Sequence, residues 1–335
     1  MNAPVSVGGP AVELQGLEKR FGDFVAVNGI TLDVGRGEIF GFLGPNGAGK
    51  STTIRMLCGI ITPTAGRGVV AGHDVRTEPE KIKASIGYMS QKFSLYNDLT
   101  VEENLDFYGG IYGLDRQRLR ERKEKVLELA RLRDQRSLRT SVLPAGWKQR
   151  LSLGCAILHE PPIVFLDEPT SGVDPISRRA FWELIYTLAD EGVTVFVTTH
   201  YMEEAEYCQR LALIYRGNLI ALGTPGELKT RYMTDAVIEI LSDRPTEAID
   251  VVSGIDGVRD TALFGRGLHA VTAEPERAVE TIGETLRAQG FAVERVRRIV
   301  PSLEDVFVSL IERSDRGTMG PVGPMEKPIA PEVHP

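Results

Sequence analysis

Residues 44–52 read GPNGAGKST, and this stretch decides the fold class. It matches the phosphate-binding pattern G-x-x-x-x-G-K-[ST]. The apolar run IFGFL before it predicts a buried strand, and a helix is predicted from Lys50 to Cys58. In a turn between a strand and a helix, glycines let backbone N–H groups surround phosphates, and the helix N-terminus adds its positive end. The sequence therefore predicts a nucleotide site at this turn.

The residues of this turn have separate expected roles. Lys50 is expected to reach the β and γ phosphates, and the hydroxyl of Ser51 is expected to bind Mg²⁺. The alternative, a glycine-rich turn with an exposed lysine, is disfavoured by the strand and helix that flank it. The predicted nucleotide-binding residues are Gly44, Pro45, Asn46, Gly47, Ala48, Gly49, Lys50, Ser51 and Thr52.

Two acidic residues close a second apolar run, IVFLDE at 163–168. This places Asp167 at the carboxyl end of a buried strand, where open α/β sheets bind ligands. Asp167 is expected to hold magnesium, and Glu168 is expected to polarise an attacking water. A strand that simply ends in solvated carboxylates is the alternative. A third run, VFVTTH, ends in His200, which could contact the γ-phosphate and orient the water, although a lone histidine at a strand end is more often structural.

The order of elements predicts an α/β protein with a second, smaller domain. Strands alternate with helices up to about residue 232, which indicates a parallel core. A βαββαβ-like unit is predicted over 233–313, ending in a helix capped by Ser302. Residues 1–10 and 314–335 are rich in Pro and Gly or small residues, and they are predicted to be a disordered arm and tail.

Composition excludes several classes of protein. With 42% hydrophobic and 25% charged residues, the chain of 335 residues has the profile of a globular protein. The net charge of -7 argues against a nucleic-acid partner, and the basic run within 100–140 is predicted to be a solvated helix face. Three scattered cysteines indicate neither disulfides nor a zinc site. No apolar run approaches the ~20 residues of a membrane span, so a membrane role is expected to act through a partner.

Five motifs occur in a family order: GPNGAGKST, YMSQKFSLYNDLTVEENL, LPAGWKQRLSLG, IVFLDEPTSGVDP and VTTH. In this order the chain resembles the nucleotide-binding subunit of an ABC transporter over about residues 12–230. The resemblance implies a P-loop NTPase core with an antiparallel β subdomain near the N-terminus and a helical subdomain around 95–155. An α+β accessory domain then follows the ATPase domain of 11–232. The stretch PSLEDVFVSL (301–310) is similar to the ending of drug-resistance exporters, with a generic amphipathic helix as the alternative.

The resemblance also assigns roles to single residues. Phe21 falls where the family stacks an aromatic ring on adenine, although a core phenylalanine is the alternative. Gln91 is expected to reach magnesium and the water, with residues 91–104 facing a membrane partner. Asp174 belongs to a loop that contacts a second protomer. The implied catalytic residues are Glu168, His200 and Gln91, the metal ligands are Ser51, Gln91 and Asp167, and the cofactors are ATP and Mg²⁺.

The stretch LPAGW (143–147) departs from the family signature Leu-Ser-Gly-Gly-Gln at three of its five positions. The family serine donates a hydrogen bond to the γ-phosphate, whereas Pro144 has neither a hydroxyl nor a backbone N–H. A helix expected to begin near Trp147 can still turn its amides toward an anion, together with Leu143, Ala145 and Gly146. Losing one hydrogen bond to a charged group costs about 1.5–3 kcal/mol, which is a penalty in rate or affinity rather than abolition, so hydrolysis is still expected.

The resemblance implies an ATPase that powers transport, with export favoured, through a separate membrane permease. The subunit would act as a homodimer, or as a heterodimer with a second ATPase subunit, on the cytoplasmic side of the membrane. One alternative is a soluble ABC-type ATPase that is not tied to transport; such families tend to carry tandem cassettes or a long coiled-coil insertion, and neither occurs here. The other is a regulatory module that binds ATP without hydrolysing it, suggested by Pro144 and Ala145.

Overall fold

The computed structural model describes residues 9–91, 95–233 and 235–316. The chain forms two compact units with a boundary between Thr224 and Pro225, and each is described by itself. None of the helices in the described part of the chain is long and apolar enough to cross a bilayer.

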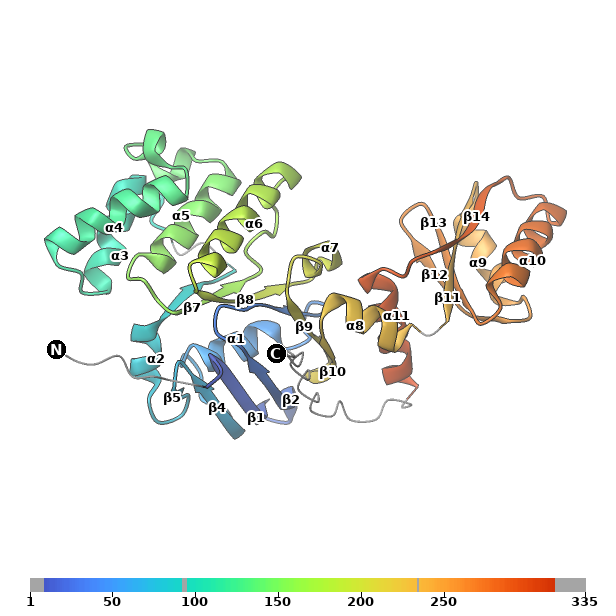
Figure 1. Ribbon diagram of the computed structural model, residues 1–335, viewed down its shortest axis with the longest axis horizontal. Helices are drawn as coiled ribbons and strands as arrows, with labels where there is room; N and C mark the ends of the chain where they lie inside the picture. The colour runs from blue at the N-terminus through green and yellow to red at the C-terminus, as the bar shows by residue number, and fades with distance from the viewer. Residues whose placement is uncertain (1–8, 92–94, 234, 317–335) are drawn as a thin grey trace, which may run out of the picture. The chain divides into compact units, whose positions relative to one another are not determined.

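A six-stranded sheet carries the first unit, in the order β10-β9-β3-β8-β7-β6 (Figure 1). β3, β7 and β8 are buried along their whole length, which explains why they read as apolar runs in the sequence. Neighbouring strands from β6 to β9 are parallel, and β10 is antiparallel to β9. The strands span β3 (Ile39–Leu43), β6 (Ile86–Met89), β7 (Ile163–Asp167), β8 (Thr194–Thr199), β9 (Arg210–Tyr215) and β10 (Asn218–Gly223).

A second, antiparallel sheet has the order β2-β1-β4-β5, which confirms the predicted β subdomain. Helix α1 (Lys50–Leu57) contacts both sheets, and one apolar core joins them through Leu14, Ile54 and Phe165. The predicted extension of this helix to Cys58 is one residue too long, because Cys58 is its C-cap. The other elements are β1 (Val12–Phe21), β2 (Phe24–Val34), β4 (Ala65–Val70), β5 (His73–Asp74) and α2 (Pro79–Ser85).

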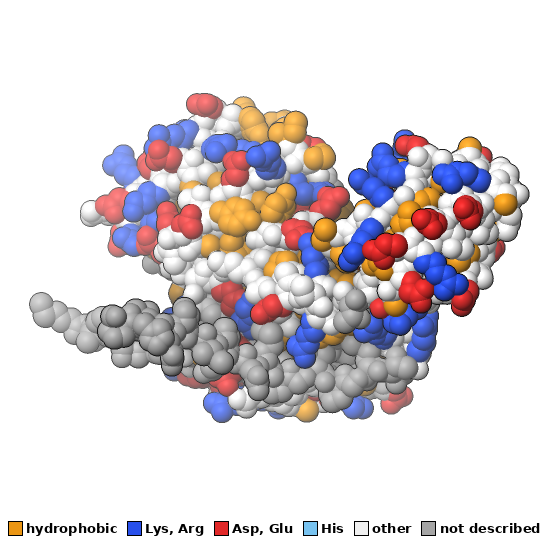
Figure 2. Space-filling model, turned by 45° about the vertical axis from the view of Figure 1, so that its right-hand side comes forward, with side chains coloured by type: hydrophobic (Ala, Val, Ile, Leu, Met, Phe, Trp, Pro, Cys, Tyr) orange, Lys and Arg blue, Asp and Glu red, His pale blue; other side chains and the backbone are white. Residues whose placement is uncertain are grey.

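Helices cover the other face of the six-stranded sheet, where α5 contacts β6 and α6 contacts β3 and β8. The basic run becomes α4, and its charges are paired: the half-buried Lys123 contacts both Glu102 and Asp106. On the face drawn in Figure 2, acidic and basic side chains are interspersed. The elements are α3 (Val101–Ile111), α4 (Arg116–Leu129), η1 (Arg133–Gln135), η2 (Thr140–Val142), α5 (Ala145–Ile157), α6 (Pro175–Asp190) and α7 (Met202–Ala205).

The second unit has the predicted βαββαβ order, with the antiparallel sheet β12-β13-β11-β14. Helices α9 and α10 share an apolar core with this sheet. Ser302 and Asp305 form a capping box at the last helix, as predicted for Ser302. The elements are α8 (Pro225–Tyr232), β11 (Ala236–Ser242), α9 (Pro245–Ser253), β12 (Val258–Phe264), β13 (Gly267–Thr272), α10 (Pro275–Ala288), β14 (Val293–Ile299) and α11 (Leu303–Asp315).

The ends of the chain differ from expectation where they are described. Helix α11 continues to Asp315, so the predicted tail from residue 314 begins too early. Residues 1–8 and 317–335, on which the remaining predictions of a disordered arm and tail fall, lie outside the described residues. Helix α8 packs against α11, which groups it with the second unit although the predicted boundary follows it.

Candidate functional site

The glycine-rich turn lies between β3 and α1, as predicted, and its glycines are required by close packing. A Cβ on Gly44 would lie 2.3 Å from the carbonyl oxygen of Ile214. Gly49 has a φ of 109°, and a Cβ there would lie 2.5 Å from the carbonyl oxygen of Ala26. No other residue fits either place without moving the backbone, so the turn requires glycine at both positions.

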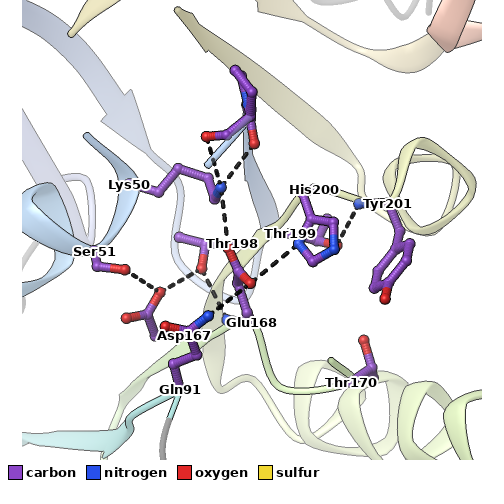
Figure 3. A network of polar contacts seen from close by, with 12 residues as sticks. Lys50, Ser51, Gln91, Asp167, Glu168, Thr170, Thr198, Thr199, His200 and Tyr201 are labelled. Atoms are coloured by element: carbon purple, nitrogen blue, oxygen red, sulfur yellow. Dashed lines mark hydrogen bonds and ion pairs between the residues drawn. The ribbon is translucent and has the colours of Figure 1, made fainter. Parts of the chain in front are cut away.

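Lys50 occupies the centre of the site and is 4% exposed. Its ammonium donates to the carbonyl oxygens of Gly44, at 2.7 Å, and Pro45, at 3.2 Å. The same Nζ lies 3.1 Å from Oε1 of Glu168 (Figure 3). The cation therefore joins the glycine-rich turn to Glu168 of the acidic pair.

Asp167 ends β7 with its carboxylate facing α1. Ser51 donates to its Oδ1 at 3.1 Å, and Thr198 of the neighbouring strand donates to the same atom at 2.8 Å. Burial raises the pKa of Asp167. A bound cation would offset the cost of this buried charge, and hydroxyl and carboxylate oxygens are the ligands that Mg²⁺ takes. Ser51 and Asp167 therefore fit a magnesium ion.

The carboxylate of Glu168 contacts the side chains of Gln91 and His200, the other two predicted catalytic residues. Gln91 donates through Nε2 to its Oε2 at 3.0 Å, and Nδ1 of His200 lies 3.1 Å from the same oxygen. Its φ of 49° is unusual for a residue with a side chain. This conformation is supported by the Glu168 backbone N–H, which donates to the hydroxyl of Thr198 at 3.0 Å. A strained backbone thus holds the carboxylate among Lys50, Gln91 and His200 (Figure 3).

Thr198 is a site residue that the sequence reasoning missed. Its one hydroxyl donates to Asp167 and accepts from the backbone of Glu168, so it orients both acids. The available signal was a polar residue inside the otherwise apolar strand run VFVTT. This signal does not identify the partners of Thr198, because Glu168 and Asp167 lie 30 and 31 residues away in the sequence.

Phe21 lies at the end of β1 and is 51% exposed, which rules out the core alternative. The Nζ of Lys19 lies 5.1 Å from the centre of its ring. An exposed ring beside a cation can stack on a planar, electron-rich base. The adenine contact itself stays a prediction.

The variant loop does not meet the Lys50–Glu168 cluster within one chain, as far as the described contacts go. Leu143 is 4% exposed, so its side chain contributes to packing. A Cβ on Gly146 would lie 2.5 Å from the hydroxyl of Ser177 at the start of α6. Asp174 caps the same helix by accepting from the backbone of Ser177 at 2.9 Å. The close approach of Gly146 to Ser177 joins α5 to α6.

The helix after the variant loop begins at Ala145, two residues before the predicted start. Pro144 is its N-cap, and the Pro144 carbonyl oxygen accepts from the N–H groups of Trp147 and Lys148 at 3.0 and 3.1 Å. The prediction was wrong because it treated LPAG as loop. A proline needs no N–H at this position, so the helix can start directly after it.

Comparisons with known proteins identify the family. The family described as "ABC transporter" matches residues 27–171. The Nod factor export ATP-binding protein I of Rhizobium sp. (strain N33) is 38% identical over 90% of this chain and 97% of that protein. The chain belongs to the ATP-binding subunits of ABC transporters. The linearmycin resistance ATP-binding protein LnrL of Bacillus subtilis (strain 168) is 34% identical over 91% of this chain and 99% of that protein.

Two further ABC proteins match about two thirds of this chain. The probable multidrug ABC transporter ATP-binding protein YbhF of Escherichia coli (strain K12) is 52% identical over 68% of this chain, but the match spans only 39% of that relative's length. A solved ATP-binding subunit of an ABC transporter is 30% identical, with a TM-score of 0.60 over 66% of this chain and 93% of that one. These ABC cassettes confirm the predicted fold class, and membership in the family confirms ATP binding as the property of this domain.

Proposed function

We propose that the chain is the ATP-hydrolysing subunit of an ABC transporter and powers export of a small molecule through a separate membrane permease. The observation that carries this proposal is the meeting of Lys50, Gln91 and His200 on the carboxylate of Glu168, beside the Ser51–Asp167 pair. The relatives' names, which refer to multidrug transport, Nod factor export and linearmycin resistance, support export.

In the proposed reaction, water attacks the γ-phosphorus, the bond to the β–γ bridging oxygen breaks, and ADP leaves with phosphate. Glu168 accepts the proton of the water, while Gln91 and His200 hold its carboxylate and the water in line. Lys50 supplies positive charge to the phosphate oxygens. Ser51, Asp167 and Gln91 would hold Mg²⁺, which when bound neutralises phosphate charge.

We further propose that two copies, or this chain and a second ATPase subunit, meet head to tail. Each site would be completed by Leu143, Ala145, Gly146 and Asp174 of the other protomer. Ala145 begins α5 and is exposed, so the first amides of that helix are available to a phosphate on another chain, and Asp174 at the start of α6 is exposed as well. Leu143 would contribute only through its backbone, since its side chain is buried.

The permease would contact the surface that follows Gln91. Asn104, the last residue of the predicted contact segment, is fully buried and bonds to Tyr96 and Thr140, so its side chain is not part of that surface. Tyr96 and Phe107 are exposed instead, with their ring centres 4.5 Å apart. Residues 92–94 lie outside the described residues. Through this contact the subunit would lie peripherally on the cytoplasmic side of the membrane.

Two measurements test the proposal together. Phosphate release by the purified chain should require both ATP and Mg²⁺, and the tagged chain should co-purify with a multi-span membrane protein from its own cells. Hydrolysis without any membrane partner would favour an ABC-type ATPase that is not tied to transport. Absence of ATP-dependent phosphate release would contradict the enzymatic role.

Thr198→Val is expected to raise the Mg²⁺ concentration needed for half-maximal hydrolysis by about tenfold, because outer-shell partners of metal ligands affect affinity to this degree. The change keeps the shape of the side chain and removes the bonds to Asp167 and to the backbone of Glu168. Thr194→Val is the matched control: Thr194 is a buried threonine of the same strand, and its hydroxyl accepts from the N–H of Gly37 rather than bonding to either acid. Equal Mg²⁺ requirements in the two variants would remove Thr198 from the site.

A second candidate function, an ATP-binding module that does not hydrolyse, is favoured by one observation: Pro144 caps α5 without any side-chain hydrogen bond. Pro144→Ser is expected to stabilise the protein by about 1 kcal/mol, because serine is a good N-cap. It should also speed hydrolysis by about tenfold, because it restores a donor to a charged group.

Glu274→Ser is the control for the capping effect alone, since Glu274 is the N-cap of α10 and also lacks a side-chain cap bond. It should stabilise the chain and leave hydrolysis unchanged. Phosphate release and thermal unfolding are measured for both variants. A wild-type chain that closes on ATP, with no turnover before or after Pro144→Ser, would favour the non-hydrolysing module.

A further inference from the structure

One buried carboxylate close to the site, that of Glu204, has no role in the reaction proposed above. Glu204 of α7 is fully buried. The hydroxyl of Thr170, which follows Glu168 by two residues, donates to its Oε1. Its Oε2 accepts no hydrogen bond from any described residue. A carboxylate in such a place is costly unless a cation lies close to it, so the identity of that cation matters.

The cation is Arg178, and it belongs to α6. Its Nε lies 3.3 Å from Oε1 of Glu204, within ion-pair distance although without hydrogen-bond alignment. The guanidinium carbon of Arg178 also lies 4.3 Å from the centre of the Tyr201 ring. Arg178 is four residues after Asp174, whose carboxylate caps α6, and its own N–H bonds to the carbonyl oxygen of Asp174 at 2.9 Å. Arg178 is therefore tied to the loop proposed to face the second protomer.

Tyr201, which Arg178 contacts, lies next to the catalytic residue His200. The ring of Tyr201 lies against that of His200, with centres 4.1 Å apart and planes inclined by 37°. His200 in turn approaches Glu168 through Nδ1 (Figure 3). One continuous set of contacts thus runs from the start of α6 through Arg178 and Tyr201 to His200, and Glu204 holds Arg178 in this set.

We infer that Glu204 and Arg178 are positioning residues for hydrolysis: they hold His200 against Glu168 and link that contact to the Asp174 loop. The inference rests on the proposed function. An apolar pair in the same space would pack equally well. The charged pair restricts the orientation of Arg178, because its guanidinium contacts both the Glu204 carboxylate and the Tyr201 ring. Closure of a second protomer on the Asp174 loop would therefore change the position of His200 relative to Glu168.

Glu204→Gln tests this inference in the full chain. The amide oxygen still accepts from Thr170, but Arg178 loses its countercharge, so His200 should lose its fixed orientation. We expect kcat to fall about tenfold while KM for ATP stays within about twofold, as expected when a reacting group is misplaced and substrate binding is not. A loss of stability alone would not separate these two parameters.

The chain offers a matched control in Glu38. Glu38 is also buried and pairs with an arginine: Arg210 Nη1 lies 3.2 Å from its Oε2, and the Arg210 guanidinium carbon lies 5.7 Å from the centre of the Phe40 ring. Glu38→Gln should lower the melting temperature to a similar degree and leave kcat unchanged. If both variants lower kcat equally, the effect is general destabilisation and the inference is overturned.

A double variant keeps the test decisive if Glu204→Gln folds poorly. Glu204→Gln with Arg178→Gln leaves no buried unpaired charge, so thermal stability should recover while kcat stays about tenfold low. A kcat within twofold of wild type in the folded double variant would overturn the inference. A wild-type chain without Mg²⁺-dependent ATP hydrolysis would instead overturn the proposed function, so the two failures are distinguishable.

Discussion

Glu168→Gln is expected to bind ATP, to dimerise with it, and to hydrolyse it on the order of 100-fold or more slowly than wild type, the usual effect of losing a general base. The amide keeps the size of the side chain among Lys50, Gln91 and His200, but it cannot accept the proton of the attacking water. Phosphate release gives the rate, and size-exclusion chromatography with ATP gives the dimer.

The control for this variant is Glu191→Gln, because Glu191 is an exposed residue at the C-cap of α6. It removes the same charge from the chain and should hydrolyse ATP at the wild-type rate. Turnover by Glu168→Gln close to that of this control would remove Glu168 from the role of base. A variant that binds ATP but stays monomeric would contradict the head-to-tail arrangement.

Lys50→Met is expected to weaken binding of Mg²⁺-ATP by about 100-fold, because a hydrogen bond to a charged group contributes about 1.5–3 kcal/mol and the ammonium can offer more than one. The long apolar side chain fills the same buried space without the charge. It also leaves Glu168 without its cation, which adds negative charge near the phosphates. Calorimetric titration with the nucleotide measures the dissociation constant.

Lys125→Met is the control, because it makes the same lysine-to-methionine change and removes the same charge at a site away from the nucleotide. Lys125 is an exposed lysine of α4 and should leave the dissociation constant at the wild-type value. Equal affinities in Lys50→Met, Lys125→Met and wild type would contradict the nucleotide site at residues 44–52. Loss of affinity in both variants would point to a general electrostatic effect.

Much of the site could be predicted from short stretches of sequence. The turn around Lys50 and the acid pair of Asp167 and Glu168 are encoded by neighbouring residues, because a strand, a tight turn and a helix N-terminus are local structures. Ser51 and Asp167, each predicted as a magnesium ligand, also lie in contact, since parallel strands end at one edge of the sheet. Helix α5 begins two residues before its predicted start, because Pro144 acts as its N-cap.

The sequence by itself determined the P-loop core, the antiparallel and βαββαβ sheets, and the types of residue that meet at the nucleotide site. Only the tertiary structure decided that Thr198 orients both acids, that Asn104 and Leu143 are buried, and that Glu204 pairs with Arg178 behind His200. The reason is physical. Local backbone preferences act over a few residues, whereas the bond from Thr170 to Glu204 joins positions 34 apart, which only the packing of α6 and α7 on the sheet brings together.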